Sequence, residues 1–174
     1  GEQCCCDFRV KQAGFTLLEL LASVAIVGVL AAMAAPSLST VLERRRLIAA
    51  AEAIVSDLRW AKGEAIKRNV DVTVTFTPGV AGSWSYVMAT VAPATIKTVS
   101  SATTTEFKDV ALTATTFSSN DTLFNHSRGT AAGQNGSVTL TSATNAYAVR
   151  VVLSTLGRAR ICSASGKVGG YEAC

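Results

Sequence analysis

The chain has 174 residues, of which 49% are hydrophobic, with a mean hydropathy of +0.34 and a formal net charge of +4. This length leaves room for one modest folded domain with one core, once a long apolar segment is set aside. The basic balance is too mild to predict a polyanion-binding protein by itself, since many basic proteins bind no nucleic acid.

The first residues, "GEQCCCDFRVKQAG", form a short polar segment that contains Cys4, Cys5 and Cys6. Arg9 and Lys11 lie close to the apolar segment that follows. Positive residues beside a membrane span favour retention in the cytoplasm. The segment is therefore expected on the cytoplasmic side of a membrane.

An apolar segment follows, "AGFTLLELLASVAIVGVLAAMAAPS", with no charged residue from Leu20 to Leu42. At about 1.5 Å per helical residue it is long enough to cross a hydrocarbon core of about 30 Å. Glu19 lies near its start, and an ionisable group in such a span is a functional hypothesis by default. The alternative is that Glu19 lies at the level of the lipid headgroups, where a carboxylate costs little.

The helical pattern continues beyond the apolar segment, through "LSTVLERRRLIAAAEAIVSDLRWAKGEAIKRN". Apolar residues recur there at helical spacing, at Leu47, Ala50, Ile54, Leu58 and Ala61. A secretory signal peptide would stop at a small-residue cleavage site such as "AAMAAPS", whereas this pattern goes on. The sequence predicts one helix from Phe15 to about Arg68, kinked or loosened at Pro36.

From Val70 onward the pattern changes to alternation, with β-branched and aromatic residues typical of strands. The predicted strands are "VDVTVTFT", "SWSYVMAT", "GSVTLTS" and "AYAVRVVLS", while "TVSSATTTE" is either a loop or an edge strand. The fold class expected is α+β. A long N-terminal helix, first transmembrane and then amphipathic, would pack on a C-terminal antiparallel β-sheet or sandwich domain.

Two further cysteines, Cys162 and Cys174, lie at the C-terminal end. If the apolar segment separates two compartments, these two lie on the side opposite Cys4, Cys5 and Cys6. An oxidising compartment there would allow a disulfide between them. Zinc is the competing interpretation, but two cysteines without a histidine pair make a poor metal site, so the disulfide is preferred.

The stretch "KQAGFTLLELLASVAIVGVLAAMAAPS" resembles the N-terminal signature of type IV pilins and type II secretion pseudopilins, with Gly14 to Glu19 and Pro36 at the family's positions. The resemblance implies that a prepilin peptidase cuts after Gly14 and methylates Phe15. It also implies that Glu19 meets the N-terminal ammonium group of a neighbouring subunit in a filament core. In that apolar setting attraction is strong and an unpaired charge is heavily penalised.

The resemblance further implies a pilin-like organisation. The subunit would first be a single-pass protein of the inner membrane with a periplasmic C-terminal domain, and would then join other pilin subunits in a pilus outside the cell. The expected parts are a cleaved leader at 1–14, a transmembrane and filament-core helix at 15–42, the amphipathic half of the helix at 43–69 and a globular β-domain at 70–174.

The stretch "HSRGTAAGQNGSVTLTSATNAYAVRVVLSTLGRARIC" resembles the closing segment of the pseudopilin H and FimT class. Its Gly-Arg-x-Arg motif is Gly157, Arg158, Ala159 and Arg160. In the FimT branch this motif is implicated in DNA binding, which implies a minor type IV pilin that binds double-stranded DNA for uptake in natural transformation. The alternative is a minor pseudopilin H of type II secretion with purely protein partners.

Elementary geometry supports a DNA contact at this motif. In a strand, Arg158 and Arg160 share a face about 7 Å apart, near the spacing of successive phosphates on one DNA strand. Each guanidinium can bind a phosphate with two hydrogen bonds. Gly157 would permit close approach of a ligand or a turn, and Lys167 would add a third charge. The alternative is solvated charge that blunts a sheet edge, and Arg128 is interpreted as a turn or packing residue.

No catalysis is expected from this sequence. The single histidine, His126, has no cysteine or acidic partner near it in sequence. No nucleophile elbow or metal-ligand cluster is visible, and "GTAAGQNG" does not lead from a strand into a helix as a phosphate loop should. The sequence therefore predicts no enzyme, no cofactor and no metal.

Overall fold

The computed structural model describes residues 14–90, 94–131, 133–165 and 167–174, without the side chains of residues 34–36. The predicted leader lies outside these residues apart from Gly14, as do its three cysteines. The chain divides into two compact units, Gly1–Ser39 and Thr40–Cys174. Helix α1 (Leu17–Arg68) begins in the first unit and ends in the second, as the sequence predicts.

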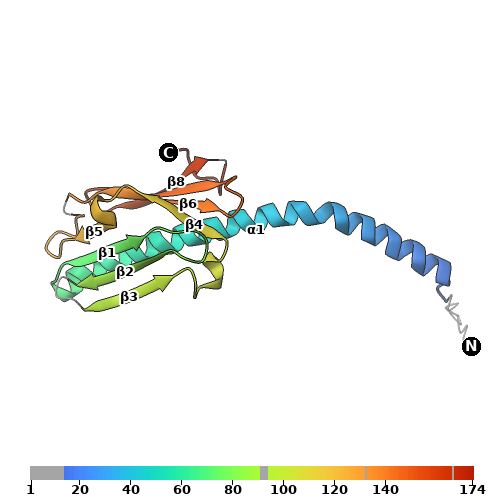
Figure 1. Cartoon of the computed structure of the whole chain (residues 1–174), viewed down its shortest axis with the longest axis horizontal. Helices are drawn as coiled ribbons and strands as arrows, with labels where there is room; N and C mark the ends of the chain where they lie inside the picture. The colour runs from blue at the N-terminus through green and yellow to red at the C-terminus, as the bar shows by residue number, and fades with distance from the viewer. Residues whose placement is uncertain (1–13, 91–93, 132, 166) are drawn as a thin grey trace, which may run out of the picture. The chain divides into compact units, whose positions relative to one another are not determined.

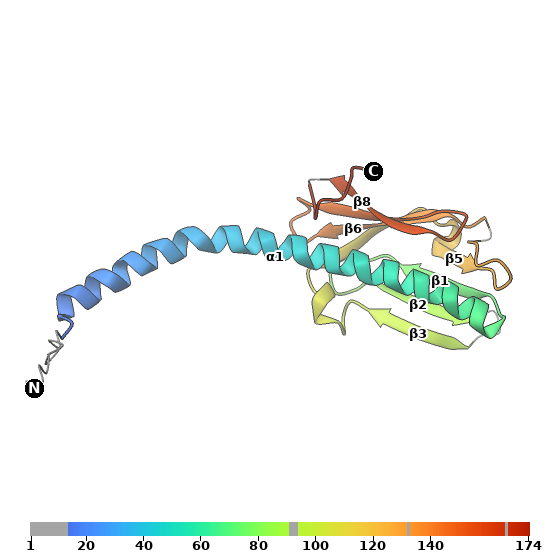
Figure 2. The same cartoon turned by 180° about the vertical axis from the view of Figure 1, so that it is seen from behind.

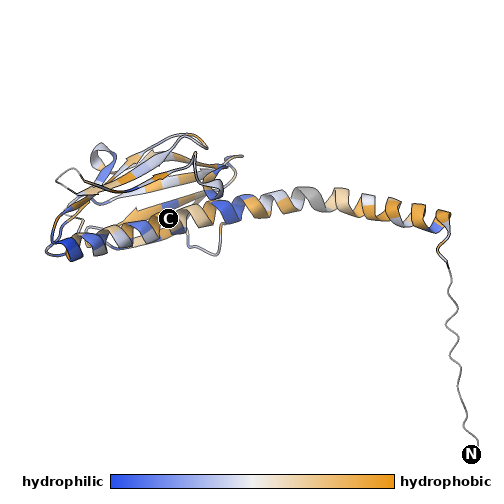
Figure 3. Ribbon diagram, turned by 90° about the horizontal axis from the view of Figure 1, so that it is seen from below, coloured by the Kyte–Doolittle hydropathy of each residue, from blue (hydrophilic) through white to orange (hydrophobic). Residues whose placement is uncertain are grey.

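The described part of the first unit is an exposed apolar segment that is helical from Leu17. Its leucine, isoleucine and valine side chains are mostly exposed, and Glu19 is the only charged residue from Gly14 to Ser39. Figure 3 shows the hydrophobic colouring of this part of α1. In the part of the chain described here, no single helix is long and apolar enough to cross a membrane. The successive segments Leu17–Met33 and Ser37–Arg68 satisfy that requirement together, by length and composition.

In the second unit, the remainder of α1 is amphipathic. All five of its predicted core positions are at most 2% exposed: Leu47, Ala50, Ile54, Leu58 and Ala61. The helix ends at Asn69, which adopts a left-handed conformation (φ 54°) and lets the Val70 amide donate to the carbonyl oxygen of Ala65. This is the hydrogen-bond pattern of a Schellman cap, in which asparagine replaces the more usual glycine.

In the described residues, eight strands form two antiparallel sheets of four strands each. In the first sheet the order is β3 (Thr95–Ser100), β2 (Ser85–Thr90), β1 (Val72–Thr77) and β5 (Asp121–Phe124). In the second sheet it is β4 (Val110–Thr115), β6 (Gly136–Ser142), β7 (Ala148–Leu153) and β8 (Ala159–Ser165). Short 3₁₀ turns lie at Thr105–Phe107 and Ser118–Asn120.

The four predicted strands correspond to β1, β2, β6 and β7, so the α+β class is confirmed. The Ser/Thr-rich stretch of uncertain assignment begins in β3, an edge strand. β4 and β5 were not among the predicted strands. The motif strand β8 begins at Ala159, which leaves Arg158 one residue outside it.

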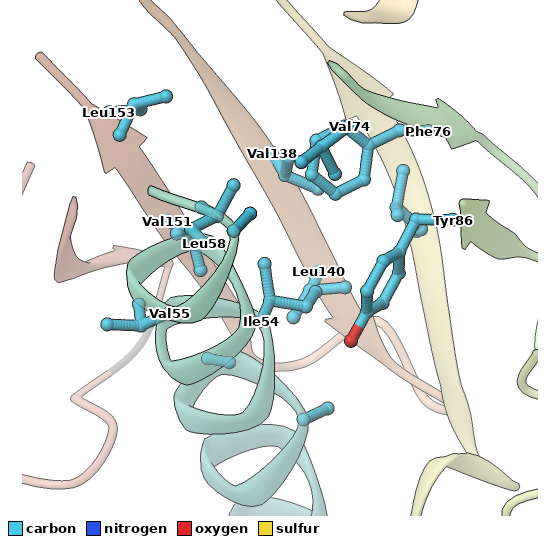
Figure 4. Close-up of a cluster of buried hydrophobic side chains, with 14 of the residues drawn as sticks. Ile54, Val55, Leu58, Val74, Phe76, Tyr86, Val138, Leu140, Val151 and Leu153 are labelled. Atoms are coloured by element: carbon cyan, nitrogen blue, oxygen red, sulfur yellow. The ribbon is translucent and has the colours of Figure 1, made fainter. Parts of the chain in front are cut away.

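The core of the second unit lies where α1 faces both sheets. Figures 1 and 2 show β6 and β8 to one side of this part of the helix, while β1 and β2 overlap it in both views. Figure 4 shows Ile54 and Leu58 of α1 directed toward side chains of both sheets, among them Leu140 and Tyr86. Every buried hydrophobic residue of the described chain lies at Leu47 or beyond, so the unit Thr40–Cys174 contains its whole core.

Candidate functional site

The Gly-Arg-x-Arg motif forms the end of a β-hairpin between β7 and β8. The Ser154 amide donates to the carbonyl oxygen of Arg158 (3.0 Å), and the Arg158 amide donates to Ser154 Oγ (3.2 Å). Gly157 donates to the Ser154 carbonyl oxygen (2.9 Å) with φ +69°. The left-handed conformation that glycine tolerates therefore closes the turn, and Arg158 continues the hairpin pairing of β8.

Gly157 is buried against a second loop, residues 125–131. A Cβ atom at this position would lie 2.5 Å from the Gly129 carbonyl oxygen. The amide of Ala131 donates to the Thr155 carbonyl oxygen (2.9 Å), which joins this loop to the hairpin. Of the two roles expected for Gly157, a turn and a close approach to a ligand, the structure gives it the turn together with a close backbone contact.

The second loop is also held by two contacts between His126 and Asp71 that the sequence does not reveal. The backbone amide and the ring Nδ1 of His126 lie 2.8 and 2.7 Å from Asp71 Oδ1. Hydrogen bonds from the amide and the ring lower the pKa of Asp71. His126 thus has an acidic partner 55 residues away, and their contact fixes the loop that carries Arg128 and Gly129.

Helix α1 contributes cations to the same region. Lys62 Nζ donates to the carbonyl oxygen of Leu156 (3.3 Å) in the hairpin turn. The Lys62 side chain also lies beneath Gly129, since a Cβ there would be 2.8 Å from its Cε. Lys62 therefore contacts both the loop that carries Arg128 and the hairpin that carries Arg158.

A groove lies between α1 and β8. It measures about 390 Å³ and is lined by Glu52, Val55, Ser56, Arg59, Arg160, Ile161 and Tyr171. The Tyr171 hydroxyl donates to Glu52 Oε1 (2.8 Å), and partial burial together with this contact raises the pKa of Tyr171. Arg59 and Arg160 thus approach the groove from the helix and from the strand.

Some basic side chains of the domain are paired within it, and others are not. Arg46, Arg68 and Lys97 each form an ion pair, with Asp109, Glu64 and Asp57 respectively. Four arginines of the region are exposed, and their side chains have no hydrogen bond or ion pair to any other described residue: Arg59, Arg128, Arg158 and Arg160. Their charges are available to an external anion.

The C-terminal loop is fastened to β8 by the predicted disulfide. Cys162 and Cys174 are bonded, with Cα atoms 5.1 Å apart. Ser163 donates to the Glu172 carbonyl oxygen (2.7 Å) and accepts from the Cys174 amide (3.1 Å), so the chain end runs along the edge of β8. This covers part of an edge that would otherwise be open to pairing.

Lys167 was expected beside the two arginines, within the loop closed by the disulfide. It instead lines a separate pocket with Ser163, Ala164, Ser165, Gly170, Tyr171 and Ala173. Only Tyr171 lines both this pocket and the groove. Lys167 therefore does not share the groove of Arg160.

Sequence reasoning did not identify Arg59 and Lys62 as site residues. A signal was present, because Glu52, Val55, Arg59, Lys62 and Ile66 follow each other at intervals of three or four and so share one helix face. What the sequence does not show is that this face lies along β8 and the hairpin turn. In the described ranges, no group of three or more His, Cys, Asp or Glu side chains is arranged to hold a metal ion.

The family described as "Type II transport protein GspH" matches residues 50–157, which is more than half of the chain. The prokaryotic N-terminal methylation motif matches residues 9–35. No curated protein and no solved structure matches the chain. The expectation that the chain is not an enzyme is confirmed, because this family is structural. The matched segment, the long helix and the two-sheet domain show that the chain belongs to the GspH family of type II secretion pseudopilins and carries their N-terminal methylation motif.

Proposed function

We propose that this protein is a minor type IV pilin that binds double-stranded DNA through Arg158 and Arg160, and contributes to DNA uptake and to pilus assembly. The observation that carries the proposal is the hairpin itself. It presents two exposed guanidinium groups two residues apart, without an ion pair to another described residue. Each fork can bind a phosphate group with two hydrogen bonds.

The surroundings of the hairpin support this use. Gly157 and the contact with Gly129 fix the turn, and Lys62 of α1 lies directly beneath it. Because the backbone of the hairpin is already fixed, only the arginine side chains lose conformational freedom on binding. A single subunit with few phosphate contacts is expected to bind weakly, and several copies in a filament would compensate by avidity.

The DNA proposal is tested by replacing both arginines. In the domain Thr40–Cys174, the double variant Arg158→Ala/Arg160→Ala should bind double-stranded DNA at least about tenfold more weakly at low ionic strength, because two charge-assisted contacts are lost. The slope of log affinity against log salt should become shallower by about 2. Titration of DNA into isotope-labelled domain, followed by amide shifts, measures both the affinity and the binding site.

A matched control is Arg45→Ala/Lys108→Ala, which removes the same charge from two exposed side chains outside the hairpin and groove. It should bind DNA almost as well as wild type. If amide shifts avoid residues 157–167, or both double variants bind equally, the motif has a structural role only. Secretion pseudopilin H with protein partners is then the better assignment, and the match to a type II transport family is the observation that favours it.

Processing is part of the same proposal. We propose that prepilin peptidase removes the leader, residues 1–14. The helix at 15–42 would first span the inner membrane, with the amphipathic half of the helix (43–69) and the β-domain (70–174) in the periplasm. Mature subunits would then enter a pilus. Mass spectrometry of protein from native membranes should find a methylated N-terminal Phe15. An intact segment from Cys4 to Gly14 in that material would contradict the proposal. A substitution at Gly14 is the control, because it should block cleavage and leave residues 1–14 attached.

A further inference from the structure

We propose that the DNA backbone lies in the groove between α1 and β8, and that Arg59 of the helix binds it together with Arg160 of the strand. The inference rests on the proposed function and extends it by a binding residue outside the motif. Adding Arg59 changes the predicted DNA-binding surface from a strand face to a groove. A strand face alone offers a flat row of charges, whereas the groove offers two walls with a guanidinium on each.

The helix face along β8 has a consistent series of contacts. Ile48 lies within contact distance of a Cβ at Gly169, Glu52 accepts from Tyr171, and Lys62 donates to Leu156. Arg59 lies on this face one turn before Lys62, at about 1.5 Å of rise per residue. Unlike those of Glu52 and Lys62, the side chain of Arg59 makes no hydrogen bond or ion pair to the described chain, although it lines the groove.

The acidic residue of the groove, Glu52, offsets only one of its two positive charges. Glu52 accepts a hydrogen bond from the Tyr171 hydroxyl. It precedes Arg59 by seven residues, which corresponds to about 10 Å along the helix axis. The hydroxyl side chain of Ser56 lies between them in the sequence and also lines the groove. The groove therefore carries two positive charges, one negative charge and the Ser56 hydroxyl as a donor, and its surplus positive charge suits one phosphodiester group.

A solvated arginine needs no partner, so what distinguishes Arg59 is that it lines the same groove as Arg160. Two like charges that face one groove repel each other modestly in water, and an internal carboxylate would normally relieve the repulsion. Among the described residues no carboxylate pairs with either arginine. An external anion supplies the missing charge. Lys62 and the exposed Arg158 at the hairpin turn continue the positive surface beyond the groove, so a polyanion fits better than a single small ion.

The test uses the full chain in detergent micelles and a short fluorescein-labelled DNA duplex, with binding measured by fluorescence anisotropy at several salt concentrations. Arg59→Ala should weaken binding by about fivefold to tenfold, and reduce the salt slope by about 1, because one phosphate contact is lost. Arg45→Ala is the control, since it removes an equally exposed arginine from the same helix, 14 residues away from Arg59. Arg59→Lys should retain part of the affinity because the charge remains.

The outcomes separate this inference from the function on which it rests. If Arg59→Ala binds DNA like Arg45→Ala while Arg158→Ala/Arg160→Ala loses binding, the proposed DNA-binding function is supported. The inference that DNA lies in the groove is then wrong. If wild type fails to bind the duplex, or the double variant binds as wild type does, the proposed function fails and the groove inference fails with it. Thermal unfolding of each variant excludes loss of fold as the cause, and a folded Arg59→Ala with selectively weakened binding supports the groove.

Discussion

Replacing Gly157 by alanine is expected to lower the free energy of unfolding of the Thr40–Cys174 domain by about 2–5 kcal/mol, from two additive effects. The first is backbone strain, because φ is +69° and an alanine in that region costs about 1 kcal/mol or more. The second is a clash, because the new Cβ would lie 2.5 Å from the carbonyl oxygen of Gly129. That oxygen belongs to backbone, so it cannot rotate away as a side chain would.

Gly82→Ala separates the two effects. Gly82 also has a positive φ, of 82°, but a Cβ there meets no atom within 4 Å. Only the strain remains, and the expected loss is about 1 kcal/mol. Urea denaturation of both variants, followed by circular dichroism, measures the difference. Equal losses would mean that the contact between the two loops relaxes at no cost.

The stability of Gly157→Ala also decides how its effect on DNA binding is interpreted. If Gly157→Ala unfolds a large fraction of the domain, its loss of DNA binding reports on the hairpin and not on a contact between glycine and DNA. The glycine of the motif is then a positioning residue that holds Arg158 at the end of the turn. Only variants of the arginines test the binding itself.

The sequence predicts the parts of the fold whose pattern is local. The apolar segment, the 3.6-residue spacing from Leu47 to Ala61 and the alternation in β1, β2, β6 and β7 each lie within one element. β4 and β5 were not recognised, because their short stretches have weaker signals. In β4, "VALTAT", only Val110 and Leu112 are buried among small and polar residues. Its strand character comes from pairing with β6, which a local pattern does not reveal.

The candidate site is less predictable because its contacts are distant in sequence. Tyr171 and Glu52 are separated by 119 residues, and Leu156 and Lys62 by 94. The motif indicated Arg158 and Arg160, but the expectation for Lys167 assumed that proximity to the disulfide means proximity to the arginines. The chain instead returns along β8 through residues 171–174, which brings Tyr171 to the groove.

Glu19 has a local role in the helix that the sequence analysis did not consider. Thr16 precedes α1, and its Oγ1 accepts a hydrogen bond from the Glu19 amide (3.2 Å). Thr16 and Glu19 have the spacing of a capping box, in which the residue three positions on is glutamate or glutamine. An acidic side chain in the first turn also interacts favourably with the helix dipole. A variant at Glu19 therefore changes helix capping as well as any contact with a neighbouring subunit.

We expect Glu19→Ala to abolish incorporation into filaments while the Thr40–Cys174 domain stays folded. Breaking an ion pair in an apolar core costs about 3–5 kcal/mol, whereas losing a capping interaction costs only about 1 kcal/mol. Glu19→Gln distinguishes the two, because glutamine can replace glutamate in a capping box but carries no charge. If the carboxylate pairs with a neighbour's N-terminal ammonium group, both variants should be absent from sheared filaments by immunoblot, yet present in the membrane at wild-type level. Normal incorporation of Glu19→Gln would show that the residue serves the helix end and that its charge is not needed for assembly.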